Sequence, residues 1–182
     1  MDEQEEKKVI HSILKGEKQD YGRLMDVHKS PIFNLAYRMT GNRTDAEDLT
    51  QEIFIRAYLH LNKFNPEKRF FTWLYTIALN LIRNHLKTLS RRRRDESQIV
   101  LINAQQNDAG NRQIHPEPFE PESILLETSL LRLPSDLREV IVLRYYQGLS
   151  FEEIASITGK SQSAVKMRTY RGLEKLKKTM NL

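Results

Sequence analysis

The chain has 182 residues, with 29 lysines and arginines against 24 aspartates and glutamates, and no cysteine. This length allows one or two small domains, and the lack of cysteine excludes disulfides and thiolate metal sites. The acidic N-terminus is unlike a signal peptide, and no apolar run approaches the roughly 20 residues that span a bilayer, so we expect a cytoplasmic protein without membrane insertion.

Helical periodicity dominates the chain and no stretch is typical of a strand, so we predict an all-α fold. The pattern predicts a short helix from Val9 to Lys15 that ends at Gly16, and another that begins at Tyr21. Pro31 is expected to open the next helix at its first turn, where its missing N–H costs nothing. Gly41 is expected to end that helix.

An acidic helix follows and runs to about Leu61. Thr44 is expected to cap it, with Glu47 completing a capping box. Acids in the first turn are expected in any helix, because they interact favourably with the positive N-terminal end of the helix dipole. Asp48 and Glu52 lie beyond the first turn, so the dipole does not explain them. Such a face would dock a basic protein partner rather than DNA. The predicted buried stripe consists of Ala46, Leu49, Ile53 and Ala57.

A long helix is predicted from about Phe71 to the arginine run at 91–94, and its two faces differ. One face is apolar and includes His85, which we interpret as a core histidine. The other face has two carboxamides, three cations and no acid: Thr76, Asn80, Arg83, Asn84, Lys87 and Arg91. Carboxamides can read base edges and cations can hold phosphates, so this face favours nucleic acid over an ordinary solvated surface.

Aromatic residues interleave with cations just before and within the start of this helix: Phe64, Phe70, Phe71, Trp73 and Tyr75. This combination is suited to stacking with unpaired bases, and each stacked base contributes on the order of 1–3 kcal/mol to the free energy of binding. The competing interpretation is that the rings are core, and we expect at least half of them to be buried.

From Asp95 to Glu120 the amphipathic pattern gives way to prolines, asparagines and glutamines, with five acids against one arginine. This composition predicts a flexible acidic linker. We therefore expect two small helical domains: an N-terminal helical bundle (1–94) and a C-terminal helix-turn-helix domain (122–182), joined by the linker (95–121).

The last third of the chain predicts the helix-turn-helix itself. Ser150 can cap a first helix with Glu153 completing a capping box, Gly159 lies where the chain must turn, and Ser161 can cap a second helix. The segment from Lys160 to Lys178 has seven lysines and arginines against one acid, so the second helix could enter a DNA major groove. An ordinary helical hairpin with a solvated cationic face is the alternative.

Three stretches together resemble the sigma factors of bacterial RNA polymerase, specifically the two-domain extracytoplasmic-function group of the sigma-70 family. They are DAEDLTQEIF at 45–54, FTWLYTIALN at 71–80, and the helix-turn-helix with VKMR at 165–168. The resemblance implies a protein that binds core RNA polymerase and directs promoter recognition and transcription initiation, for a stress or envelope regulon.

The resemblance also implies residue roles. The acidic helix would bind the clamp of the polymerase's largest subunit through Asp48, Gln51, Glu52 and Phe54, and the polymerase flap is a further expected contact. The minus-ten element would be bound by Lys63, Phe64, Asn65, Asn80, Arg83, Asn84 and Lys87. The minus-thirty-five element would be bound by Ser161, Gln162, Lys166, Met167, Arg168, Tyr170 and Arg171. An anti-sigma factor is a further implied partner.

Other classes of protein fit less well. The five histidines are scattered without metal-ligand spacing and no glycine-rich phosphate loop occurs, so we predict no catalytic site, no metal and no cofactor. The main alternative is a stand-alone helix-turn-helix repressor or activator that binds a palindrome. A protein that merely sequesters another factor would need neither the aromatics beside the long helix nor a second DNA-reading unit.

Overall fold

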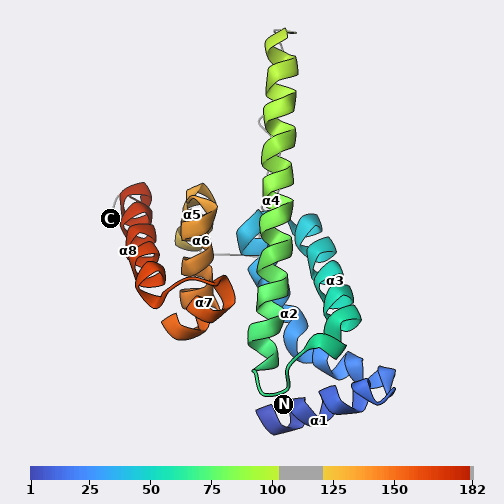
Figure 1. The fold of residues 1–182 in the computed structure, drawn as a ribbon. Coiled ribbons are helices and arrows are strands. Elements are labelled where there is room, and N and C mark those ends of the chain that lie inside the picture. Colours follow the sequence, from blue (N-terminus) through green and yellow to red (C-terminus); the bar gives the residue numbers. More distant parts are fainter. Residues whose placement is uncertain (103–120, 181–182) are drawn as a thin grey trace.

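Helices form every regular element of the computed structural model, which describes residues 1–102 and 121–180. The prediction of an all-α fold is confirmed for this part of the chain. The longest helix, α4 (Phe70–Ile102), stands between the N-terminal helices and the C-terminal helices (Figure 1). Among the described residues, no helix combines the length and apolar character needed to cross a membrane.

The N-terminal domain consists of α1 (Glu3–Leu14), α2 (Tyr21–Thr40), α3 (Arg43–His60) and α4, with the 3-10 turns η1 (Lys18–Asp20) and η2 (Leu61–Lys63). Helix α1 begins before the predicted Val9 because the Asp2 side chain accepts a hydrogen bond from the Glu5 N–H at 2.8 Å and caps the helix. Its residues Val9, Ile10 and Ile13 are buried in the core of the domain.

Helix α2 continues through Pro31, so the prediction that this proline opens a new helix is wrong. A proline inside a helix removes a backbone hydrogen bond and typically costs about 3 kcal/mol. Burial on both sides of the proline offsets this cost, because Leu24 and His28 precede it, and Ile32 and Leu35 follow it, on the buried face.

Gly41 and Asn42 form the junction between α2 and α3. Gly41 takes the left-handed conformation (φ 70°), as expected of a residue that ends a helix. The Asn42 side chain accepts a hydrogen bond from the Asp45 N–H at 3.0 Å and caps α3. The predicted cap at Thr44 is therefore wrong: Asn42 has the extended backbone of a cap, and Thr44 lies inside the first turn. The predicted stripe is confirmed as buried: Ala46, Leu49, Ile53 and Ala57.

Helix α4 has the predicted apolar face, with Leu74, Ala78 and Ile82 fully buried. It extends past the arginine run to Ile102, into the stretch predicted to be linker. The extension is consistent with the sequence, because residues 91–102 contain neither glycine nor proline to end a helix. The rest of the predicted linker, residues 103–120, lies outside the described residues.

The C-terminal domain consists of α5 (Pro121–Arg132), α6 (Ser135–Ile141), the π-helical turn η3 (Val142–Tyr146), α7 (Phe151–Thr158) and α8 (Gln162–Met180). Leu133 and Pro134 separate α5 from α6. Gly172 allows α8 to cross α6 closely, because a Cβ atom there would lie 2.9 Å from Ile141 Cγ1. Val140, Ile154 and Val165 form part of the core, each fully buried.

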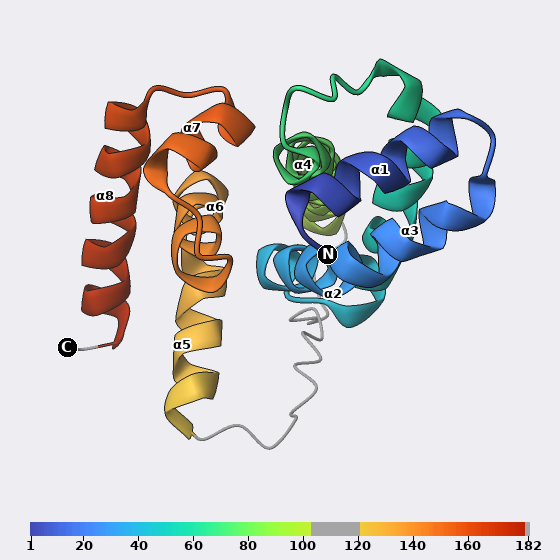
Figure 2. The ribbon, with the colours of Figure 1, turned by 90° about the horizontal axis from the view of Figure 1, so that it is seen from below.

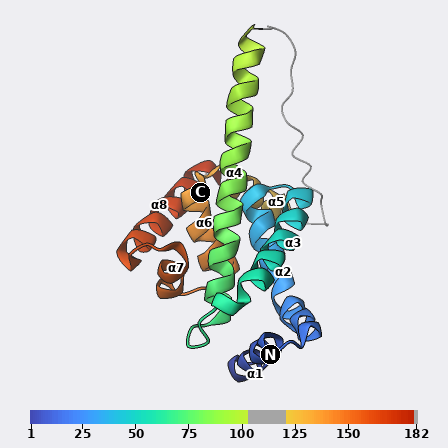
Figure 3. The same ribbon diagram turned by 45° about the vertical axis from the view of Figure 1, so that its right-hand side comes forward.

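The two domains are in direct contact. Helix α7 packs against α4, while α5, α6 and η3 pack against α2. Helix α8 lies on the side of its domain that faces away from α4, and α3 lies on the opposite side of α4 (Figures 1 and 2). The same order is visible after a turn about the vertical axis (Figure 3). The docked arrangement therefore covers one side of α4 and leaves α3 and α8 uncovered by the other domain.

Candidate nucleic-acid and protein interfaces

The exposed face of α3 combines acids with apolar side chains. Asp48, Gln51 and Glu52, predicted as contact residues, all lie on this face, where Glu52 forms a 2.6 Å surface ion pair with Arg56. At 100° per residue, five side chains fall within an arc of about 100°: Asp48, Gln51, Glu52, Ile55 and Leu59. Ile55 and Leu59 are 54% and 64% exposed. Exposed apolar residues bordered by acids are typical of a protein–protein interface.

Two aromatic residues predicted as contacts are buried instead. Phe54 is 2% exposed, and its backbone carbonyl accepts a hydrogen bond from the Tyr21 hydroxyl at 2.7 Å. Phe64 is 5% exposed and packs edge-on against Phe70, with 5.6 Å between ring centroids. Because neither side chain presents a surface, we do not retain either as a direct contact. The aromatic cluster follows the core interpretation, with Phe64, Phe70 and Tyr75 buried.

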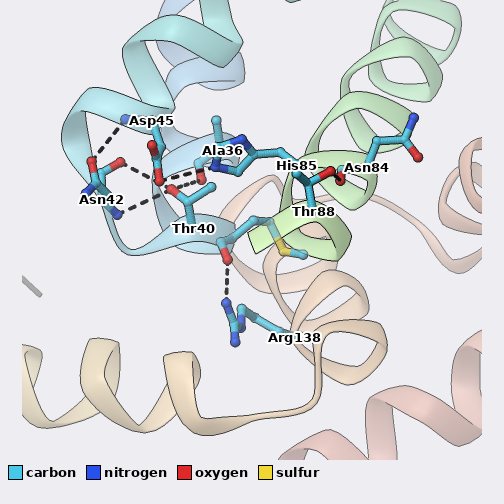
Figure 4. Close-up of polar contacts among 9 residues, drawn as sticks. Ala36, Thr40, Asn42, Asp45, Asn84, His85, Thr88 and Arg138 are labelled. Atoms are coloured by element: carbon cyan, nitrogen blue, oxygen red, sulfur yellow. Dashed lines mark hydrogen bonds and ion pairs between the residues drawn. The ribbon is translucent and has the colours of Figure 1, made fainter. Parts of the chain in front are cut away.

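The polar face of α4 is mostly exposed. Asn80, Asn84 and Lys87 lie at the surface, as the sequence predicts for a face that meets nucleic acid. On the opposite side, His85 Nε2 lies 3.2 Å from Asp45 Oδ2, an ion-pair distance without hydrogen-bond geometry. Figure 4 shows His85 directed toward Asp45 and Asn84 directed away from it. His85 thus joins α4 to α3, but its side chain is 28% exposed, so it lies at the edge of the core and not inside it as predicted.

The loop between η2 and α4 holds the other residues predicted at the minus-ten element. Lys63 is exposed at the end of η2. The Asn65 side-chain oxygen accepts a hydrogen bond from the Glu67 N–H at 3.0 Å, so this oxygen shapes the turn. The Asn65 amide nitrogen is the part of the side chain that is left to contact a ligand.

The helix-turn-helix forms as predicted. The Ser150 side chain accepts a hydrogen bond from the Glu153 N–H, and the Glu153 carboxylate accepts from the Ser150 N–H, which completes the capping box. Gly159 takes the left-handed conformation (φ 67°). Ser161 caps α8 by accepting a hydrogen bond from the Ala164 N–H at 3.2 Å. These local contacts fix the start of α8.

Five of the seven residues predicted to contact the minus-thirty-five element have exposed side chains with no competing role in the helix. They are Gln162, Lys166, Met167, Tyr170 and Arg171. The Lys166 ammonium lies 5.8 Å from the centroid of the Phe151 ring, a cation–π contact. Arg168 instead pairs with Asp136 of α6 at 3.4 Å, and the Ser161 hydroxyl is engaged in the cap.

Arg83, on the polar face of α4, is only partly exposed. It donates two hydrogen bonds, of 2.7 and 2.6 Å, to the Glu139 carboxylate of α6. These bonds raise the pKa of Arg83 above its usual value, although burial acts in the opposite direction. Glu139 was not singled out by sequence reasoning. Residues 137–143 are apolar except for Arg138 and Glu139, and an acid in such a stretch is a signal that could have identified it, because a buried charge requires a partner.

The fold and these surfaces are typical of a helical, two-domain DNA-binding protein. Comparison with known families makes this specific: the model of Sigma-70 region 2 matches residues 24–92, and the model of Sigma-70, region 4 matches residues 123–176. The chain belongs to the sigma-70 family of bacterial RNA polymerase sigma factors, in its extracytoplasmic-function (ECF) group. It directs promoter recognition by core RNA polymerase, and the stand-alone regulator is not favoured.

Similar proteins cover nearly the whole chain. The chain is 35% identical to the ECF RNA polymerase sigma factor SigW of Bacillus subtilis, with 96% of each chain covered. It is 32% identical to the ECF RNA polymerase sigma-E factor of Escherichia coli K12, covering 91% of this chain and 89% of that protein. Among solved structures, the sigma factor RpoE bound to the anti-sigma factor NepR from Bartonella quintana has a TM-score of 0.70, with 24% identity over 90% of this chain and 98% of that chain. CnrH in complex with the cytosolic domain of CnrY has a TM-score of 0.69, with 24% identity and 96% of each chain covered. These two structures establish similarity of fold.

Proposed function

We propose that three surfaces of the chain divide the work of initiation: α3 binds core polymerase, α4 binds the minus-ten element, and α8 reads the minus-thirty-five element. The observation that carries this proposal is the chemistry of the three faces. The α3 face is acidic and apolar, the α4 face carries carboxamides and cations, and the α8 face carries cations and an exposed tyrosine. An acidic face repels DNA phosphates, whereas the other two attract them.

The proposed polymerase contact is the α3 face. Asp48, Gln51 and Glu52 would pair with basic groups, and Ile55 and Leu59 would supply the apolar part of the interface. By membership of the family, we propose the clamp of the largest subunit as the surface that receives α3. We propose the polymerase flap as the contact of the C-terminal domain.

The proposed minus-ten contact is the exposed face of α4 with the preceding loop. Asn80 and Asn84 would hydrogen-bond base edges, and Lys87 and Lys63 would hold phosphates. Arg83 would join them as a phosphate contact once it is free of Glu139. The buried position of the neighbouring aromatics supports base recognition by the carboxamides rather than by ring stacking.

The proposed minus-thirty-five contact is α8 in the major groove. Lys166 and Arg171 would contact bases and phosphates, and the Tyr170 and Met167 side chains, 67% and 54% exposed, would contact apolar edges such as thymine methyls. Arg168 would reach a phosphate by leaving its exposed partner Asp136, a pair of small energetic value. The hydroxyl of Ser161 and the side chain of Gln162 lie at the start of α8, where helix N-termini contact phosphates.

Three broader points complete the proposal. We propose that the protein works in the cytoplasm, where its polymerase is, and that it has no catalytic site or cofactor of its own. An anti-sigma factor is a proposed partner, supported by the solved sigma factor RpoE, which has the same fold and was determined with the anti-sigma factor NepR. We divide the roles between an N-terminal domain ending near residue 94 and a C-terminal domain beginning near residue 122.

The polymerase contact can be tested by capture of purified core polymerase on the immobilised full-length protein. Asp48→Arg should weaken binding at least about tenfold, because it places a cation opposite a basic partner. Glu47→Arg is the matched control: the charge change and helix are the same, but the residue lies outside the proposed face. Equal loss of binding by both variants, or by neither, would remove the assignment of α3.

A further inference from the structure

The Phe151 ring at the start of α7 lies within cation–π distance of two cations. The Arg144 guanidinium carbon is 4.8 Å from the ring centroid, and the Lys166 ammonium nitrogen is 5.8 Å from it. Both distances are inside the range of about 6 Å over which the face of an aromatic ring attracts a cation. One ring therefore connects the turn η3, which contains Arg144, with the exposed face of α8, which contains Lys166.

The surroundings of Phe151 fix the position of its ring. Phe151 is the first residue of α7, directly after the Ser150 cap, and its ring packs partly buried against the core of the domain. Helix α7 also packs against α8, where Val165, the neighbour of Lys166, is fully buried. The core therefore holds the ring and the backbone of Lys166 at a fixed spacing.

Arg144 is anchored beside the same ring. Its guanidinium group donates a hydrogen bond to the Leu149 carbonyl at 2.7 Å, so the closer of the two cations is tied to the backbone. Because like charges repel, Arg144 opposes a closer approach of the Lys166 ammonium to the ring. The Lys166 side chain is therefore restrained by the ring but is not drawn down onto it.

This contact restrains Lys166 without occupying its hydrogen-bond donors. Unlike Arg168, which pairs with Asp136, Lys166 makes no ion pair within residues 1–102 and 121–180. An ammonium group has three N–H donors, and base edges in the major groove accept such bonds. A lysine side chain loses rotamer freedom when it binds, and an earlier restraint reduces that loss. An acid in the place of Phe151 would instead compete with DNA for the ammonium.

We propose that Phe151 is a positioning residue for promoter recognition: its ring holds the Lys166 side chain ready to meet a base edge of the minus-thirty-five element. This inference rests on the proposed role of α8. A ring that served only the fold would affect every base pair of the element alike, because its loss would displace α8 as a whole. A ring that positions Lys166 affects the one base pair that Lys166 reads.

The contact itself can be tested on the full-length protein without DNA or polymerase, by nuclear magnetic resonance with ¹³C-labelled lysine. An aromatic ring displaces the resonances of nearby hydrogens, so the Lys166 ε-methylene signal should differ from that of Lys177, an exposed lysine of the same helix. Phe151→Leu should bring the two signals together, and Phe151→Tyr should keep them apart. Coincident signals in the wild type would overturn the proposal.

Run-off transcription by core polymerase with the full-length protein measures the consequence. Each base pair of the minus-thirty-five element, in a promoter recovered from a random library, is replaced in turn, and discrimination is the ratio of transcription before and after replacement. Lys166→Ala should lose about tenfold in discrimination at the base pair that Lys166 reads. Phe151→Leu should lose about two- to fivefold at that same base pair, as expected of an exposed cation–π contact. Phe151→Tyr should retain wild-type discrimination.

A double-mutant cycle separates positioning from a structural role. Added to Lys166→Ala, Phe151→Leu should cause no further loss of discrimination, because the restrained side chain is already absent. Phe151→Met, which also lacks a ring, keeps the test valid if leucine perturbs the start of α7. Tyr145→Leu, which removes an exposed ring in η3, is the matched control and should leave discrimination unchanged.

The outcomes distinguish this inference from the proposed function. Full discrimination by both Phe151→Leu and Phe151→Met, equal loss at every base pair, or further loss in the Lys166→Ala protein would overturn the role of Phe151 alone. Lys166→Ala without effect at any base pair would overturn the proposed contact of Lys166 with the minus-thirty-five element, and the role of Phe151 with it.

Discussion

Gly41 and Leu131 meet where α2 of the N-terminal domain approaches α5 of the C-terminal domain. A Cβ atom on Gly41 would lie 2.7 Å from Leu131 Cδ1, closer than carbon atoms approach in folded proteins. Gly41 also has a positive φ of 70°, which side chains other than glycine rarely adopt. One glycine therefore serves two purposes: it ends a helix, and it allows the other domain to pack closely.

Gly41→Ala should lower the free energy of unfolding by about 1–3 kcal/mol, from backbone strain and the forced displacement of Leu131. Chemical denaturation followed by circular dichroism measures this. Gly22→Ala is the matched control, because Gly22 lies inside α2, the helix that Gly41 ends, with ordinary φ and open space around it. That variant should be neutral or slightly stabilising. Equal loss in the two variants would show that the site at Gly41 has no special constraint.

The helix-turn-helix could be predicted from sequence because local rules determine it. The capping box of Ser150 and Glu153, the left-handed Gly159 and the cap at Ser161 each depend on a few neighbouring residues. The buried stripe of α3 and the apolar face of α4 follow similarly from helical periodicity. Together these elements also provided the family resemblance, which the comparisons confirm.

Features that depend on distant parts of the chain could not be predicted in this way. Pro31 remains inside α2 because tertiary burial on both sides offsets the local cost. Phe54 and Phe64 were predicted as contacts by position in the family pattern, but packing places both in the core. The pairing of Arg83 with Glu139 joins residues on separate domains, and no periodicity within one helix reports such a contact.

Glu153 should make the stability of the protein depend on pH. Its hydrogen bonds from Ser150 lower the pKa of Glu153 below the ordinary value of 4.5, with Arg69 adding to the effect. A carboxyl group whose pKa is lower in the folded than in the unfolded state stabilises the protein at pH values above its unfolded-state pKa. This stabilisation is lost as the pH falls through the folded-state pKa. The stability advantage of the wild type over Glu153→Gln should therefore shrink as the pH falls below the ordinary value of 4.5. An advantage that grew on acidification would contradict this assignment.

Lys166→Ala should weaken recognition of the upstream promoter element and leave core polymerase binding unchanged. Loss of one base or phosphate contact costs about 1–3 kcal/mol, so transcription that depends on this element should fall about tenfold. Lys177→Ala, at an exposed lysine nearer the end of α8, should have a smaller effect. Run-off transcription and polymerase capture, measured together, separate the two functions. Weakened polymerase capture by Lys166→Ala would mean that the roles of the domains are wrongly assigned.

Leu59→Lys should weaken the complex with core polymerase although it leaves every acid of α3 in place. Leu59 is 64% exposed, so its replacement should cost little folding stability. A central apolar contact typically contributes more than about 1 kcal/mol to an interface. Leu14→Lys, at an exposed apolar residue of α1, is the control for a general effect of surface charge. Unchanged binding by Leu59→Lys would restrict the α3 interface to its polar residues.

Run-off transcription on a library of random promoter sequences, with purified core polymerase and the full-length protein, tests the central claim most directly. We predict transcripts that depend on the added protein and that start downstream of a shared, asymmetric two-part motif. Core polymerase that shows no added initiation on any template, or selected templates that share a single palindrome, would contradict the assignment of this chain as a promoter-specificity factor.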